Sequence, residues 1–128
     1  METLSNLPVS FDPLSVKRSF NLAAPPELII PDNFGTLHIE MKEAELLEFD
    51  LGKGTGYRGY LIIGDELSPL PIGSTLDPLT GRFSWLPGPG FIAVYDLLFI
   101  ENYDYQIQKI IIINLRIHPK SSRQIRDS

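Results

Sequence analysis

The chain has 128 residues with a net charge of −5 at pH 7, 11 prolines, 10 glycines and no cysteine. That length suits one β-sandwich of about 100 residues with extensions, and the proline and glycine content is typical of strands joined by turns rather than of helices. The acidic balance argues against a nucleic-acid partner, and no apolar run approaches the roughly 18 residues of a membrane span, the longest being residues 110–113.

Residues 1–34 are predicted to be a proline-rich linker or an edge-strand extension, because their prolines come too often for a long regular element. These prolines are Pro8, Pro13, Pro25, Pro26 and Pro31. Residues 9–11 and 19–22 are candidates for short paired edge strands, and residues 28–30 for an extended strand that ends at Pro31. The N-terminus lacks the charged start and apolar stretch of a signal peptide, so the chain is either cytoplasmic or a fragment of a longer secreted protein.

Alternating apolar and polar residues predict two strands in the next part of the chain, one on each side of a short turn at Glu43 and Ala44. Their apolar positions are Leu37, Ile39 and Met41 in the first strand and Leu47, Phe49 and Leu51 in the second. Residues 52–56, rich in glycine, form a flexible turn, and residues 57–63 are expected to be a further strand.

A β-hairpin is predicted around the turn at residues 77–81. Asp77 can accept hydrogen bonds from backbone amides ahead of it, Pro78 presets its own φ, and Gly81 accepts a positive φ. After the turn, Phe83 and Trp85 point to one face, which makes them core residues. Residues 87–90 alternate proline and glycine, so the chain is expected to turn over the end of the sheet there.

Two long strands are predicted to follow, over residues 91–100 and 106–117, and residues 119–128 form a polar C-terminal tail. In the first strand Tyr95 and Leu97 share a face, and almost every position of both faces is apolar. No long helix is predicted anywhere in the chain.

The hairpin and the strand after it resemble the cadherin-like and dystroglycan-type immunoglobulin-like repeats. The residues that carry the resemblance, in family order, are Leu70, Pro71, Gly73, Asp77, Thr80, Gly81, Phe83, Trp85, Pro87 and Tyr95. The resemblance implies an all-β fold, an immunoglobulin-like (cadherin-like) antiparallel β-sandwich of about seven strands, here spanning residues 35–118. It also implies that the Tyr95 hydroxyl bonds back to nearby backbone, and that Leu97 takes the place of a disulfide cysteine of antibody domains.

The resemblance further implies a non-catalytic spacer, adhesion or protein-interaction module of a larger extracellular or cell-envelope protein. Such repeats commonly bind calcium through clustered carboxylates, for which Asp50, Asp65 and Asp104 are candidates by type, with Glu66 and Glu101. Residues 52–56 include Lys53 where many relatives carry an acidic run, so no cofactor is expected. His38 and His118 lie too far apart in sequence to indicate a catalytic arrangement, and no enzyme activity is expected.

The outward side of the two long strands is unusually apolar, with Ile110 and Ile112 beside Leu98 and Ile100. Two interpretations stay open. Either the proline-rich N-terminal segment folds back and covers this patch, or the patch receives a protein partner, an adjacent repeat or a second copy of the chain.

Tyr103 and Tyr105 fall on the loop between the last two strands. Exposed rings there would stack on a sugar, which gives the alternative function of a carbohydrate-binding accessory module of a hydrolase. Packing of both rings over the end of the sandwich is the other interpretation.

Overall fold

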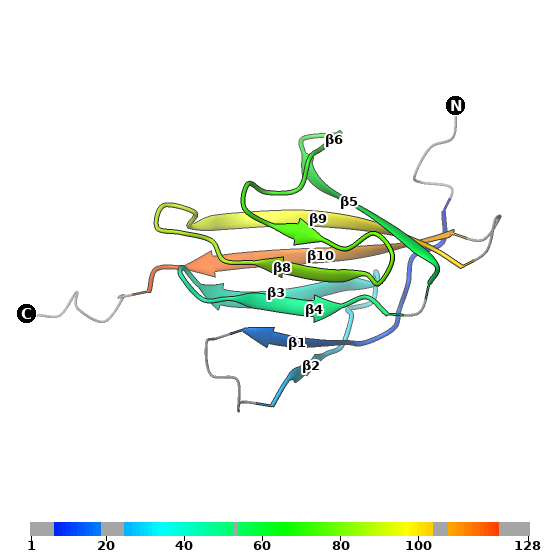
Figure 1. Cartoon of the computed structure of the whole chain (residues 1–128), viewed down its shortest axis with the longest axis horizontal. Coiled ribbons are helices and arrows are strands. Elements are labelled where there is room, and N and C mark those ends of the chain that lie inside the picture. The colour runs from blue at the N-terminus through cyan, green and yellow to red at the C-terminus, as the bar shows by residue number, and fades with distance from the viewer. Residues whose placement is uncertain (1–6, 19–24, 53, 104–107, 121–128) are drawn as a thin grey trace, which may run out of the picture.

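The computed structural model describes residues 7–18, 25–52, 54–103 and 108–120, and within these ranges the protein contains strands and turns but no helix. Ten strands form two five-stranded sheets that pack face to face as a β-sandwich (Figure 1). The prediction of an all-β sandwich is therefore confirmed, while the described residues contain ten strands rather than about seven, since several short strands extend the edges.

Sheet A contains the two long strands at its centre. Its order is β3 (Thr36–Lys42), β10 (Gln108–His118), β9 (Ala93–Asn102), β5 (Gly56–Ile63) and β6 (Glu66–Ser68). β3 runs parallel to β10, with Leu37 opposite Ile113, and the other pairs are antiparallel. The expectation of a wholly antiparallel sandwich is therefore wrong for this one edge pair. The predicted strands at residues 57–63 and 106–117 thus appear with small shifts at their ends. The predicted strand at 91–100 begins two residues later and runs to Asn102.

Sheet B is antiparallel throughout. Its order is β2 (Glu27–Ile29), β1 (Leu14–Arg18), β4 (Leu47–Asp50), β8 (Arg82–Trp85) and β7 (Thr75–Leu76). The extended strand predicted before Pro31 is β2. β1 was not predicted, although Leu14 and Val16 are both buried and alternate with exposed or half-buried neighbours.

The turn at Glu43 and Ala44 joins two different sheets. β3 and β4 flank this turn as predicted, but β3 belongs to sheet A and β4 to sheet B. Glu43 donates its backbone N–H to the carbonyl of His118, at the end of β10, while Ala44 donates to the carbonyl of Pro87, just beyond β8. These two bonds fix the crossing, and Ala44 has a φ of 66° that allows the sharp change of direction.

The hairpin between β7 and β8 has the predicted turn. The Asp77 carboxylate accepts hydrogen bonds from the amides of Leu79 and Thr80, and these bonds lower the pKa of Asp77. Gly81 has a φ of 78°, and a Cβ at this position would lie 2.8 Å from the ring of Tyr57. Glycine is therefore required at position 81 both by the backbone conformation and by the space available.

The core lies between the sheets and is built on aromatic rings. Phe49, Phe83 and Phe99 form a mutually contacting group, with ring centroids 5.0 to 5.9 Å apart. Trp85 is 1% exposed, stacks edge-on against Tyr95 at 5.3 Å, and donates its indole N–H to the carbonyl of Ile72 at 3.1 Å. The assignment of Trp85 to the core is confirmed.

Tyr95 also makes the backbone contact expected of it. Its hydroxyl donates a hydrogen bond of 3.0 Å to the carbonyl of Phe91, four residues earlier, and this bond fastens the loop to the start of β9. Burial raises the pKa of Tyr95. Two residues later, Leu97 is fully buried between its strand neighbours Leu61 and Ile113.

The N-terminal segment contacts both sheets. Val9 forms an isolated parallel bridge with Ile110 on sheet A, after which the chain crosses to sheet B and becomes β1. The other predicted edge strand, residues 19–22, lies outside the described residues, as do residues 121–128 of the predicted C-terminal tail.

Candidate interaction surface

The outer face of sheet A carries a second, smaller apolar cluster that is separate from the core. Leu98 is 6% exposed, Ile100 3% and Ile110 5%, although all three point away from sheet B. The partly buried residues packed against them are Leu7, Val9, Tyr60 and Ile62. Of the four residues predicted as an interface, three are thus covered, and the fourth, Ile112, is half-buried opposite Leu98.

Part of this cover comes from residues 7–10, which we call the strap, and part from Tyr60 and Ile62 on β5. Within the strap, Pro8 accepts a backbone hydrogen bond of 2.9 Å from Ile110, and Ser10 donates one of 2.8 Å to the same residue. This pairing extends along the edge of β10 that β3 occupies further on. The N-terminal segment therefore does fold back over part of the apolar patch, as one of the two interpretations expected.

The strap packs closely against the backbone at Gly35. The φ of this glycine is 87°, and a Cβ built there would lie 2.5 Å from Cγ1 of Val9 and 3.0 Å from the carbonyl oxygen of Ser10. No side chain fits in that space without moving the strap, so glycine at this position permits the close approach.

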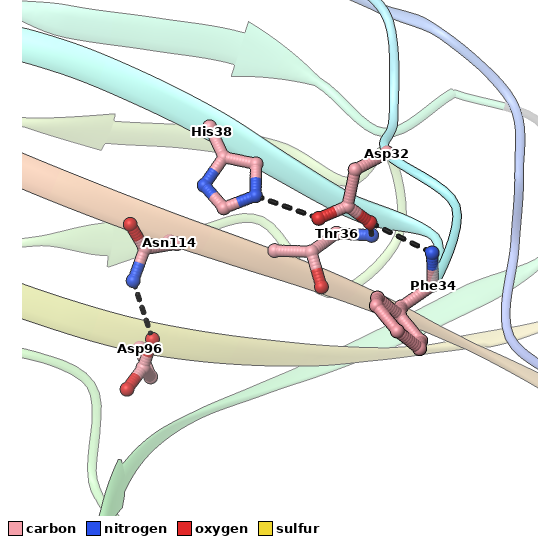
Figure 2. Close-up of polar contacts among 6 residues, drawn as sticks. All are labelled: Asp32, Phe34, Thr36, His38, Asp96 and Asn114. Carbon is pink, nitrogen blue, oxygen red and sulfur yellow. Dashed lines mark hydrogen bonds and ion pairs between the residues drawn. The ribbon is translucent and has the colours of Figure 1, made fainter.

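Beside the apolar cluster, the outer face of sheet A becomes polar. His38, Asn114 and Asp96 are aligned across β3, β10 and β9, and the Asn114 amide donates to the Asp96 carboxylate at 2.8 Å (Figure 2). His38 points toward Asp32, with 2.8 Å between Nε2 and Oδ2. Asp32 also accepts from the amides of Phe34 and Thr36, so it organises the turn before β3.

These contacts explain the acidity of Asp32. The hydrogen bond with His38, followed by those from the backbone amides of Thr36 and Phe34, lowers the pKa of this carboxyl below its ordinary value. The second histidine, His118, lies 3.1 Å from Glu40 at the far end of the same face. The two histidines of sheet A thus have separate carboxylate partners, Asp32 in the turn before β3 for His38 and Glu40 on β3 for His118.

The carboxylates considered for calcium are scattered. Asp50 is on the outer face of sheet B and contacts Arg82 at 3.2 Å, whereas Asp65 is exposed in the turn between β5 and β6, next to Glu66. Asp104 lies outside the described residues. Among the residues that the structure describes, no three histidine, aspartate or glutamate side chains come together as a possible metal site.

Glu101 has a different environment from the other acids. It is 3% exposed and accepts a hydrogen bond of 2.9 Å from the Tyr57 hydroxyl, beside a cavity of about 180 Å³ that Ser10, Asp12 and Tyr103 also line. Burial, together with the hydrogen bond to Glu101 and its charge, raises the pKa of Tyr103 to about 12. The sequence contained a signal for this burial, because Glu101 has the same parity in β9 as the core residues Leu97 and Phe99.

The tyrosine loop is only partly described. Tyr103 is half-buried, and the ammonium group of Lys109 lies 5.0 Å from the centre of its ring. Tyr105 lies outside the described residues. The described ring is thus involved in contacts within the protein at the end of the sandwich.

Taken together, the fold and the outer face of sheet A define the class of the molecule as an all-β sandwich with a strap-covered apolar surface. Comparison with protein-family models, with curated proteins and with solved structures finds no match for this chain. No helix long and apolar enough to cross a membrane occurs in the ranges that the structure describes.

Proposed function

We propose that this protein is a non-catalytic, immunoglobulin-like module that acts as an in-line spacer and interaction domain of a larger extracellular or cell-envelope protein. The fold assignment within this proposal is supported by the Tyr95 hydroxyl bond to Phe91 and by the buried Trp85.

One observation carries the spacer role, namely that the described chain enters and leaves at opposite ends of the sandwich. Val9 pairs with Ile110 near the start of β10, and Lys120 follows the end of that strand. In Figure 1 the blue beginning of the described chain lies on the right and the end of β10 on the left. At about 3.3 Å per residue, the full strand spans roughly 35 Å. Modules built in this way can follow one another head to tail without folding back.

The experiment is small-angle X-ray scattering on one copy and on two copies joined head to tail in one polypeptide. We expect the second copy to lengthen the particle by about 35 Å without widening it, since each copy contributes one strand length. A matched tandem with a long glycine-serine linker should instead give a broad distribution of lengths. Two copies that pack side by side, with little increase in length, would contradict the spacer role.

A further inference from the structure

The strap covers a surface that would otherwise be among the most apolar parts of the molecule. Leu7 and Val9 pack on Leu98, Ile100 and Ile110, and these three residues are at most 6% exposed. They face away from the core, so their burial depends on the partly buried residues around them and on the strap. Removing the strap would return large aliphatic side chains to water, which is unfavourable.

The described contacts that hold the strap are few. On β10 they consist of the two backbone hydrogen bonds of Ile110 and the packing of Leu7 and Val9. By comparison, β3 pairs with the same edge of β10 over seven residues, from Thr36 to Lys42. A short segment with few contacts opens at a lower free energy than the strands of the core. The strap, which meets sheet A at one isolated bridge, is therefore suited to local release.

The outer apolar patch, which the strap covers in part, is suited to contact with a second copy of itself. Its apolar members on the outer face of sheet A are Leu98, Ile100, Ile110, Ile112, Tyr60 and Ile62. Exposed charges of opposite sign flank them, with Arg58 opposite Ile100 and Asp96 opposite Ile62. A two-fold axis brings the same patch onto itself, so that Arg58 of each copy can approach Asp96 of the other. A patch with a central apolar area and complementary charges at its edges has the composition of a protein interface.

We propose that residues 7–10 form a releasable strap, and that its release converts the outer face of sheet A into a self-association surface. While residues 7–10 are bound to β10, the strap shields Leu98, Ile100 and Ile110 from water within the same chain. When it opens, a second copy of the chain covers the exposed aliphatic residues. This property is separable from the spacer role, because head-to-tail stacking uses the ends of the sandwich and self-association uses a sheet face.

The test measures self-association of the full chain by sedimentation velocity, with Trp85 fluorescence as the measure of an intact core. Val9→Asp introduces a charge over Ile110 and should release the strap. Gly35→Ala should release it independently, because the added Cβ would lie 2.5 Å from Val9 while the strap sequence stays unchanged. Leu28→Asp is the matched control, since Leu28 is 58% exposed on sheet B.

We expect both release variants to keep the Trp85 signal and to associate at least about tenfold more tightly than the parent chain, whereas Leu28→Asp associates no more than the parent. Adding Ile112→Lys to Val9→Asp should restore the monomer, because it places a charge on the exposed face. Several results would overturn the proposal. These are release variants that stay monomeric with an intact core, association that Ile112→Lys leaves unchanged, loss of the Trp85 signal in either variant, and a parent dimer that Val9→Asp weakens.

Discussion

Replacing Leu97 with alanine should cost this protein a large part of its stability. Leu97 is fully buried in β9, with Leu61 and Ile113 as its neighbours across sheet A. Truncation to alanine removes about 2.4 kcal/mol of transfer free energy at ~0.8 kcal/mol for each methylene-sized group. The cavity left between two sheets adds to this loss, so we expect a total of about 3–4 kcal/mol. With no disulfide in the chain, aliphatic packing is what joins the sheets at this position.

The assay is urea unfolding followed by the fluorescence of Trp85, supported by thermal melting. For a domain of this size the midpoint temperature should fall by roughly 10 °C. Val94→Ala, on the same strand but 45% exposed, is the matched control and should change the free energy of unfolding by no more than about 0.5 kcal/mol. If Leu97→Ala costs no more than Val94→Ala, the packing argument is refuted.

Three further predictions concern single contacts. Tyr95→Phe removes one hydrogen bond and should lower the free energy of unfolding by about 1 kcal/mol in the same urea assay, and an unchanged midpoint would contradict a role for that bond. Gly64 has a φ of 62° and open space around it, so Gly64→Ala should lower the free energy of unfolding by about 1–2 kcal/mol. Gly81→Ala should lower it by about 1–3 kcal/mol more, because the added Cβ would meet the ring of Tyr57. Equal losses in the two variants would show that the ring moves aside. The folded-state pKa of Asp32 lies below 3.8, so its contribution to stability is complete above that pH and is lost as the pH falls through the folded-state pKa. In Asp32→Asn the free energy of unfolding should therefore fall less steeply as the pH becomes acidic. Asp65→Asn is the control for loss of a carboxylate in a turn. If Asp32→Asn leaves the acid dependence of stability unchanged, the lowered pKa of Asp32 is refuted.

Features that depend on neighbouring residues were predictable from the sequence. The turn at residues 77–81 has the predicted hydrogen bonds to Asp77 and the positive φ at Gly81, because both are determined within five residues. The burial of Phe83 and Trp85 also follows from local alternation. The same alternation places Glu101 on the inner face of β9, but the hydroxyl that donates to its carboxylate comes from Tyr57 on another strand and had no local signal.

Features that depend on distant partners were not predictable. β1 was missed because Leu14 and Val16 stand in a proline-rich stretch, and only pairing with β2 and β4 makes this stretch a strand. Likewise, Val9 had no local signal for a partner about a hundred residues away at Ile110. The sequence left open whether the N-terminal segment or another molecule covers the outer apolar patch.

The sequence by itself determined that this protein is an all-β sandwich, because turn chemistry and period-two alternation act over a few residues. Only the tertiary structure decided which sheet each strand joins and where the N-terminal segment lies. The close approach at Gly35 leaves no room for a Cβ, which would lie 2.5 Å from Val9, a residue 26 positions earlier in the chain. Such a contact is set by packing between sequence-distant elements. For that reason the sequence indicated the outer apolar patch, but only the folded molecule showed that residues 7–10 cover part of it.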